Sequence, residues 1–208
     1  MELILAEKPS AARNFAKALG GKTGNYAGTE YKITNLRGHV MGLLPPDKQV
    51  PTEKVEFYKS WDLENLPWNL NDFAWKKGIL SGCKDIISGL KDELKEADCV
   101  VIATDVDPSG EGELLAWEAL EKCGWRGPTK RMYFADEAPA SVQKAFRERK
   151  TLPSMDKDGD YVKAVVRERW DLASMQFTRA ATLVARKKGF RTVVRQGRLK
   201  SLMVKPTS

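Results

Sequence analysis

The stretch from Cys99 to Trp117 constrains the fold more than any other part of the chain. It begins with an apolar, mostly β-branched run at 100–102 and ends in apolar residues with helical spacing at 114–120. A buried strand that leads through a loop into a helix is typical of a parallel α/β unit. Sheets of this kind bind ligands just beyond the carboxyl ends of their strands. The stretch therefore predicts an α/β fold with a functional edge after this strand.

Four carboxylates follow the strand closely, those of Asp105, Asp107, Glu111 and Glu113. They repel one another unless a cation offsets their charge, and hard oxygen ligands at this density suit Mg²⁺. A plainer interpretation is that Asp107 caps the next helix, with Pro108 at its first position, and that the glutamates complement the helix dipole. We favour a metal site because a helix start needs fewer acids.

The composition is that of an ordinary soluble globular protein, with 42% hydrophobic and 30% charged residues among 208. A net charge of +7 favours a polyanionic partner, although ribosomal, membrane-surface and simply soluble proteins share this balance. The three cysteines have no C-x-x-C spacing, which argues against a zinc site and fits a reducing compartment. We expect no signal peptide, because the apolar run at 3–6 is too short for one and also too short to cross a membrane.

The amino-terminal segment repeats the pattern of a strand followed by charged residues. Residues 2–6 predict a short buried strand, and Glu7 and Lys8 follow it. Ser10 is the expected N-cap of a helix that ends at Leu19. Because the ends of parallel strands meet at one edge of a sheet, we expect Glu7 near the four acids.

The remaining pattern predicts alternating strands and helices. We expect strands at 29–36 and 129–134, and helices at 75–97, 138–147 and 161–175, the last continuing over 177–185. An ordered but irregular excursion with aromatic residues is expected at about 45–74. Residues 150–159 read as a connector. The expected organisation is therefore an α/β domain at 1–150 followed by a mainly helical, basic segment at 151–208.

Positive charge is concentrated near the carboxyl end of the chain. Residues 163–205 contain twelve lysines and arginines against two acids, Glu168 and Asp171. A solvated helical face would show a more even balance. The imbalance favours contact with a phosphate backbone.

Several short motifs, taken in order, resemble a known family. They are Ala6-Glu-Lys-Pro-Ser10, Arg37-Gly-His-Val40, Asp105-Val-Asp107 with the following Glu-Gly-Glu, Arg131 to Ala138, Asp171 to Arg179, and Gln196 to Ser201. The first and third resemble the Toprim domain of topoisomerases, primases and some nucleases. The others resemble segments of type IA DNA topoisomerases, most closely of the topoisomerase III kind. The resemblance runs in register from residue 1 to about 205.

This resemblance implies a fold and a chemistry. The fold is a Rossmann-like Toprim domain, with a mostly parallel sheet flanked by helices. The family cleaves and reseals single-stranded DNA through a 5′-phosphotyrosine link. By resemblance, Glu7 transfers a proton at the leaving oxygen, and Lys8 offsets the charge of the phosphate. The resemblance also implies roles for eleven further residues. Asp105, Asp107 and Glu111 hold Mg²⁺, Arg131, Arg179, Arg195, Arg198 and Lys200 contact DNA, and His39, Glu113 and Asp171 are further members of the site.

The sequence also departs from the family pattern. Pro108-Ser109-Gly110 stands where the family has one arginine, so the loop is two residues longer and either Glu111 or Glu113 is the third acid. No tyrosine stands in the family's catalytic context. We therefore expect a part of a topoisomerase that is inactive alone, with single-stranded DNA and the remainder of the enzyme as partners. We expect a protein of a bacterium or of a mobile element. Its expected location is the cytoplasm, near the nucleoid, with no membrane as partner.

Two other functions stay open. A Toprim nuclease or primase-like enzyme needs metal and water but no tyrosine, although the match after residue 160 speaks against it. A catalytically inactive protein that binds single-stranded DNA is the non-enzymatic alternative. A nucleotide-binding enzyme is disfavoured, since the glycines at 110 and 112 are not followed by Gly-Lys-Ser/Thr.

Overall fold

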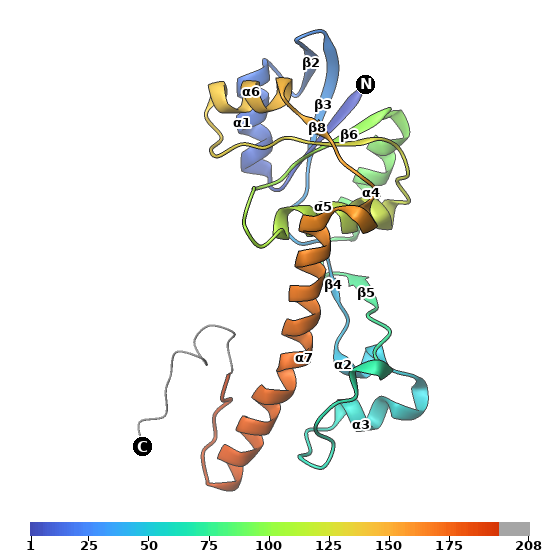
Figure 1. Ribbon diagram of the computed structural model, residues 1–208, viewed down its shortest axis with the longest axis vertical. Helices are drawn as coiled ribbons and strands as arrows, with labels where there is room; N and C mark the ends of the chain where they lie inside the picture. Colours follow the sequence, from blue (N-terminus) through green and yellow to red (C-terminus); the bar gives the residue numbers. More distant parts are fainter. Residues whose placement is uncertain (196–208) are drawn as a thin grey trace. The chain divides into compact units, whose positions relative to one another are not determined.

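The computed structural model describes residues 1–195, which divide into two compact units. The first unit consists of Met1–Gly42 and Ile79–Val165. The second consists of Leu43–Gly78 and of residues from 166 onward. Figure 1 shows the order of the elements along the chain.

A six-stranded sheet forms the centre of the first unit, in the order β2-β3-β1-β6-β7-β8 (Figure 1). The strands are β1 Glu2–Ala6, β2 Thr23–Tyr26, β3 Thr29–Asn35, β6 Cys99–Ala103, β7 Thr129–Arg131 and β8 Lys150–Thr151. Strands β3, β1, β6 and β7 run parallel, whereas the edge strands β2 and β8 are antiparallel to their neighbours. The expected mostly parallel sheet is confirmed. The two edge strands were not expected, because both are short and largely exposed and lack an apolar alternation.

Alternating side chains of the central strands build two apolar cores, one on each face of the sheet. In β1, Leu3 and Leu5 join one core, whereas Ile4 and Ala6 join the other. Helices α4 (Lys84–Glu93) and α5 (Glu111–Cys123) contribute to the first core, and α1 (Pro9–Leu19) and α6 (Pro139–Arg147) contribute to the second. Both faces are therefore covered, which is why the central strands are apolar throughout.

Some element boundaries differ from the sequence prediction. Helix α1 begins at Pro9 with Lys8 as N-cap, so Ser10 is not the cap. Proline is favoured at the first helical position because its fixed φ suits the helix and it has no N–H to satisfy. The expected helix at 75–97 is interrupted: β5 (Lys77–Ile79) precedes α4, and Gly82 has a φ of +76°. The expected helix at 161–175, with its continuation over 177–185, is present as one helix, α7 (Gly159–Lys187), which extends two residues further at each end.

The second unit has its own small apolar core. Its remaining elements are α2 Pro46–Gln49, α3 Val55–Lys59 and short 3₁₀ turns at Thr52–Lys54 and Leu70–Asp72, and β4 (Met41–Leu43) pairs with β5 where the two units join in sequence. The core consists of Val50, Tyr58, Trp68, Phe73 and Leu172. Buried Gln49 holds this excursion in shape, since its side chain bonds to the backbone of Leu44 and Lys76.

This division differs from the expected boundary between residues 150 and 151. The aromatic residues of the excursion pack with Leu172 of α7, and Gln176 accepts a hydrogen bond from the Trp68 backbone N–H at 3.0 Å. The segment 43–78 therefore groups with the carboxyl-terminal helix and not with the sheet. These contacts join residues about 100 or more positions apart, and sequence periodicity does not reveal such contacts.

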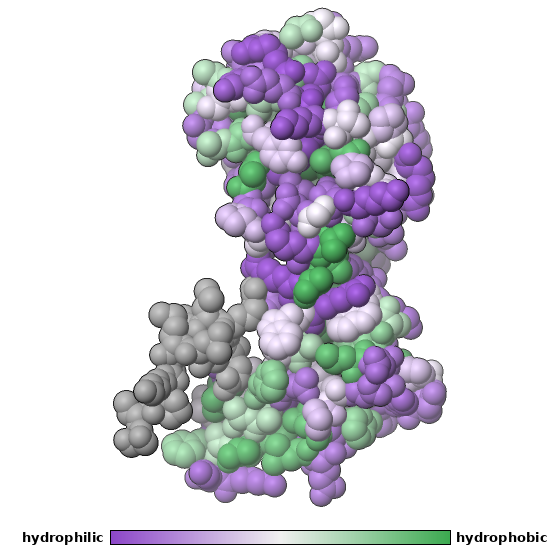
Figure 2. All heavy atoms as spheres, viewed as in Figure 1, coloured by the Kyte–Doolittle hydropathy of each residue, from purple (hydrophilic) through white to green (hydrophobic). Residues whose placement is uncertain are grey.

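The two units differ in their surfaces. Figure 2 shows mostly hydrophilic residues on the visible face of the first unit and a gathering of apolar residues on that of the second. Exposed apolar side chains of the second unit include Phe57, Trp61, Val166, Trp170, Met175, Phe177, Val184 and Phe190. Among the described helices, none is both long and apolar enough to cross a membrane.

Candidate functional site

The carboxyl ends of β1 and β6 bring two predicted site residues, Glu7 and Asp105, together. These strands are neighbours, and Ala6 pairs with Ala103 at their last rung. The residues that follow are therefore adjacent, and the carboxylate Oε2 of Glu7 accepts a hydrogen bond from the backbone N–H of Asp105 at 3.1 Å. This contact fixes the position of Glu7 beside the loop that carries the acids.

Lys8 lies at the same edge. Its Nζ is 3.0 Å from Oδ2 of Asp105, and both side chains are nearly half exposed. The hydrogen bond to Asp105 raises the pKa of Lys8 above its usual value. A protonated lysine thus offsets the first acid of the loop while both groups stay open to solvent.

Residues 104–111, here termed the acid loop, are organised around Asp107. Its Oδ1 accepts a hydrogen bond from the Ser109 backbone N–H at 2.7 Å, and Oδ2 accepts one from Gly112 at 3.2 Å. Burial raises the pKa of Asp107, but a hydrogen bond from the Ser109 hydroxyl, together with those from the backbone, outweighs burial and holds the pKa below its usual value. Gly110, and not Asp107, is the N-cap of α5, although Asp107 still satisfies an N–H of the first turn.

Glycine is required at position 112. A Cβ there would lie 2.1 Å from the backbone oxygen of Asp105, closer than real contacts allow. The buried Thr104 hydroxyl donates to the Gly112 backbone oxygen at 2.8 Å. The start of α5 and the start of the acid loop are therefore in direct backbone contact, which gives a physical reason for glycine between the two glutamates.

The structure separates the two glutamates of α5. Glu111 is 43% exposed, and its Oε1 lies 2.7 Å from Nε2 of His39. Glu113 is 2% exposed and accepts a hydrogen bond from Nε of Arg131 at 2.6 Å. Of the two, Glu111 is the one that is open to solvent, whereas Glu113 is engaged inside the protein.

Two arginines expected to contact DNA are buried. Arg131 is fully buried, and besides Glu113 it donates to the backbone oxygens of Thr104 at 2.7 Å and Asp105 at 3.2 Å. Arg179 is 7% exposed and donates to the backbone oxygen of Tyr58 at 2.6 Å. The expected DNA contact does not fit this geometry, because both guanidinium groups are engaged inside the protein.

The other expected residues are placed differently. Arg195 is exposed, and Asp171 lies half-buried on α7. Arg198 and Lys200 lie outside the described residues.

The donor set of the acid loop suits Mg²⁺, but the carboxylates do not converge. Within residues 1–195, no three His, Cys, Asp or Glu side chains come close enough together to form a metal-binding group. Mg²⁺ is commonly held by one or two carboxylates, with waters and substrate phosphates completing the octahedron. Half-exposed Asp105 and Glu111, with Asp107 between them in the sequence, fit that mode of binding better than a closed protein cage.

Sequence reasoning missed a group of residues at the start of α7. Asp158 accepts a hydrogen bond from Nε1 of Trp117 at 2.8 Å, and the backbone of Asp160 lies against Gly110 of the acid loop. Lys163 follows one turn later, 2.6 Å from Asp160. The only sequence signal was the Asp158-Gly159 pair, which is typical of a helix start but says nothing about what the helix contacts.

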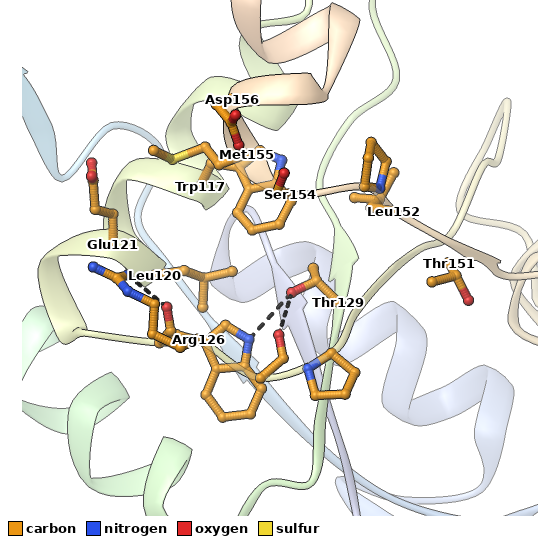
Figure 3. Close-up of a pocket in the computed structure, with 14 residues that line it drawn as sticks. Trp117, Leu120, Glu121, Arg126, Thr129, Thr151, Leu152, Ser154, Met155 and Asp156 are labelled. Carbon is orange, nitrogen blue, oxygen red and sulfur yellow. Dashed lines mark hydrogen bonds between the residues drawn. The ribbon is translucent and has the colours of Figure 1, made fainter.

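A pocket of about 560 Å³ lies elsewhere in the first unit (Figure 3). Its walls include Trp117, Leu120, Leu152 and Met155, and Thr129 accepts a hydrogen bond from Trp125 at its base. Thr129 is the first residue of β7, whereas the acids follow the last residues of their strands. The pocket is therefore separate from the acid loop.

Comparisons with known proteins point to one kind of enzyme. The family model described as Toprim domain matches residues 2–136. DNA topoisomerase 3 of Staphylococcus epidermidis is 30% identical over 151 residues, which are 71% of this chain and 20% of that protein. DNA topoisomerase 3 of Bacillus subtilis is 30% identical over 184 residues, 86% of this chain and 24% of that protein.

A solved structure shows the same fold. Full-length topoisomerase I from Thermotoga maritima superposes with a TM-score of 0.50 at 23% identity, over 72% of this chain and 21% of that one. In each of these matches the chain spans no more than about a quarter of the other protein.

Proposed function

The chain belongs to the Toprim domain family and is homologous to the amino-terminal region of DNA topoisomerase 3, and we propose on this basis that it supplies the acid-loop part of a type IA topoisomerase site. In this proposal the complete enzyme cleaves and reseals single-stranded DNA through a 5′-phosphotyrosine link. The tyrosine belongs to a part of the enzyme other than residues 1–208. The observation that carries the proposal is the meeting of Glu7, Lys8 and Asp105 at adjacent strand ends.

Each residue at this edge has a role that matches its surroundings. Glu7, held by the Asp105 backbone, exchanges a proton with the 3′ oxygen of the cleaved strand. Lys8 offsets the charge of the scissile phosphate, because its ammonium is half exposed and stays protonated. One or two carboxylates drawn from Asp105, Asp107 and Glu111, with waters and phosphate oxygens, would hold a Mg²⁺ ion, which neutralises phosphate charge when bound.

Contact with the DNA strand is assigned to basic residues near the carboxyl end of the sequence. We propose that Arg195, Arg198 and Lys200 grip the phosphate backbone, in the most basic stretch of the chain. A DNA partner and three free cysteines support a location in the cytoplasm, near the nucleoid.

The second unit offers a surface for the rest of the enzyme. Val166, Trp170, Phe177 and Val184 are exposed on α7 at spacings of four and seven residues, which place them along one stripe of the helix. Exposed apolar stripes of this kind mark protein contacts. We propose that further domains of the topoisomerase cover this stripe.

The proposal is tested by Mg²⁺ titration followed by NMR, on the chain and on the double variant Asp105→Asn/Asp107→Asn. We expect weak binding that the double variant abolishes and that a short single-stranded oligonucleotide strengthens, because phosphate oxygens complete the coordination. The matched control is Asp85→Asn/Asp156→Asn, which removes two exposed acids far from the acid loop in sequence.

Binding that survives in the Asp105/Asp107 variant, or that the control abolishes equally, would contradict the assignment of the metal to the acid loop. The same samples also distinguish a part of a topoisomerase from a Toprim nuclease. Mg²⁺-dependent cleavage of the oligonucleotide by the chain itself would favour a Toprim nuclease, since no tyrosine of a topoisomerase context is present.

A further inference from the structure

The acid loop contains no positive charge of its own. Between Thr104 and Glu111 the sequence has three acids and no lysine or arginine. Cations must therefore come from other elements, as Lys8 does for Asp105. A site that binds a polyanion beside three acids needs such cations, because the acids otherwise repel the phosphates.

The first turn of α7 is fixed against this loop. Gly110 has a φ of +75°, and a Cβ added to it would lie 2.2 Å from the backbone oxygen of Asp160. Asp158 caps the turn by accepting hydrogen bonds from the backbone N–H of Asp160 and from Nε1 of Trp117 on α5. The loop, α5 and the start of α7 thus form one packed corner of the first unit.

Lys163 extends from this corner. Its Nζ is 2.6 Å from Oδ1 of Asp160, and its side chain is 48% exposed. The hydrogen bond from Lys163 to Asp160 raises the pKa of Lys163, and the negative charges of Glu113 and Asp107 act in the same direction. The ammonium therefore stays protonated near the acid loop and remains open to solvent.

We propose that Lys163 is a phosphate-contacting residue of the acid-loop site, paired with Lys8 on a different element. Asp160 holds the ammonium in place until a phosphate oxygen of the single strand takes over the interaction. This inference rests on the proposed function, because it needs a nucleic-acid strand at the acid loop. It adds a residue from outside the matched domain at 2–136.

The test is binding of a fluorescently labelled oligothymidylate to the full chain, followed by anisotropy at several NaCl concentrations. The logarithm of the binding constant falls linearly with the logarithm of the salt concentration, and each phosphate contact on a single strand adds about 0.7 to the steepness of this slope. We expect Lys163→Ala and Lys163→Gln to lower the slope by about that amount and Lys163→Arg to restore it. Lys157→Ala, which removes an exposed lysine of the neighbouring turn, is the matched control and should leave the slope unchanged.

Asp160→Asn separates a structural role from phosphate contact. It breaks the same salt bridge but keeps the lysine, so it should leave the slope unchanged and bind the strand at least as tightly as the parent chain. An unchanged slope in Lys163→Ala would overturn the inference alone. An equal loss in Lys157→Ala would also overturn it, and failure of the parent chain to bind the strand would overturn the proposed function as well.

Discussion

Arg131 and Glu113 form an ion pair inside the first unit, with 2.6 Å between Nε and Oε1 and almost no exposure of either side chain. The same guanidinium donates to the backbone oxygens of Thr104 and Asp105. One residue of β7 therefore holds both α5 and the start of the acid loop. The pair thus positions the loop from inside the protein, whereas Glu111 of the same helix is half exposed.

Loss of Glu113 should destabilise the protein far more than loss of Glu111. Glu113→Gln leaves a buried guanidinium without its counter-charge, which typically costs about 3–5 kcal/mol. Glu111→Gln removes a half-exposed carboxylate and should change stability by less than about 1 kcal/mol. Urea denaturation followed by circular dichroism measures both. Small and equal losses of stability in the two variants would show that Arg131 finds another partner. In a separate Mg²⁺ titration, the affinity should fall only in the Glu111 variant.

The contact between the acid loop and α7 depends on glycine at position 110. Gly110→Ala introduces a side chain at positive φ, which costs about 1–2 kcal/mol, and also a clash with the Asp160 backbone oxygen. Gly124→Ala is the matched control, since Gly124 has a φ of +80° but open space around its Cβ. We expect the unfolding midpoint to fall clearly further for Gly110→Ala. Equal shifts of the two midpoints would mean that the backbone at Asp160 moves away from a side chain at position 110 at little cost.

Glu2 should make the protein sensitive to acid. Burial raises its pKa, but hydrogen bonds from Arg149 and Lys130, each at 2.6 Å, outweigh burial and lower the pKa below its usual value. A group with a lowered folded-state pKa stabilises above its unfolded pKa of about 4.3 and loses that contribution as the pH falls through the folded value. Urea midpoints of the parent chain should therefore fall below pH 5 more steeply than those of Glu2→Gln.

Glu121→Gln, which alters an exposed glutamate of α5, serves as the control for this comparison. It should follow the parent chain at every pH. Parallel curves for the parent chain and Glu2→Gln would show that the two cations do not distinguish the charged from the neutral side chain.

Local patterns predicted the centre of the fold and the edge that carries the acids. Apolar runs gave β1 and β6, and the acids that follow them indicated the site, because both signals lie within a few adjacent residues. The burial of Arg131 and Arg179 was not predictable. Each is decided by partners far away in sequence, Glu113 on another element and the Tyr58 backbone 121 positions earlier. Lys163 was missed because the sequence does not show that Asp160, its neighbour on α7, lies against Gly110, 50 positions earlier.

Tyr58 should give the second unit a sensitivity to alkali. Burial, together with its hydrogen bond to Asp72, raises the pKa of Tyr58 to about 12. The unfolded phenol ionises near pH 10, so the stability that Tyr58 provides is present below pH 10 and is lost as the pH rises towards 12. The loss should approach about 1.4 kcal/mol per pH unit in this window.

Tyr58→Phe should remove this part of the pH dependence, although losing the hydrogen bonds to Asp72 and Asn69 lowers its stability by about 1 kcal/mol at neutral pH. Denaturation midpoints between pH 9 and 12 test this, with Tyr26→Phe as the control that should retain the parent slope. Ultraviolet absorbance should show one tyrosine fewer titrating near pH 12 in Tyr58→Phe, and an unchanged titration would contradict the assignment.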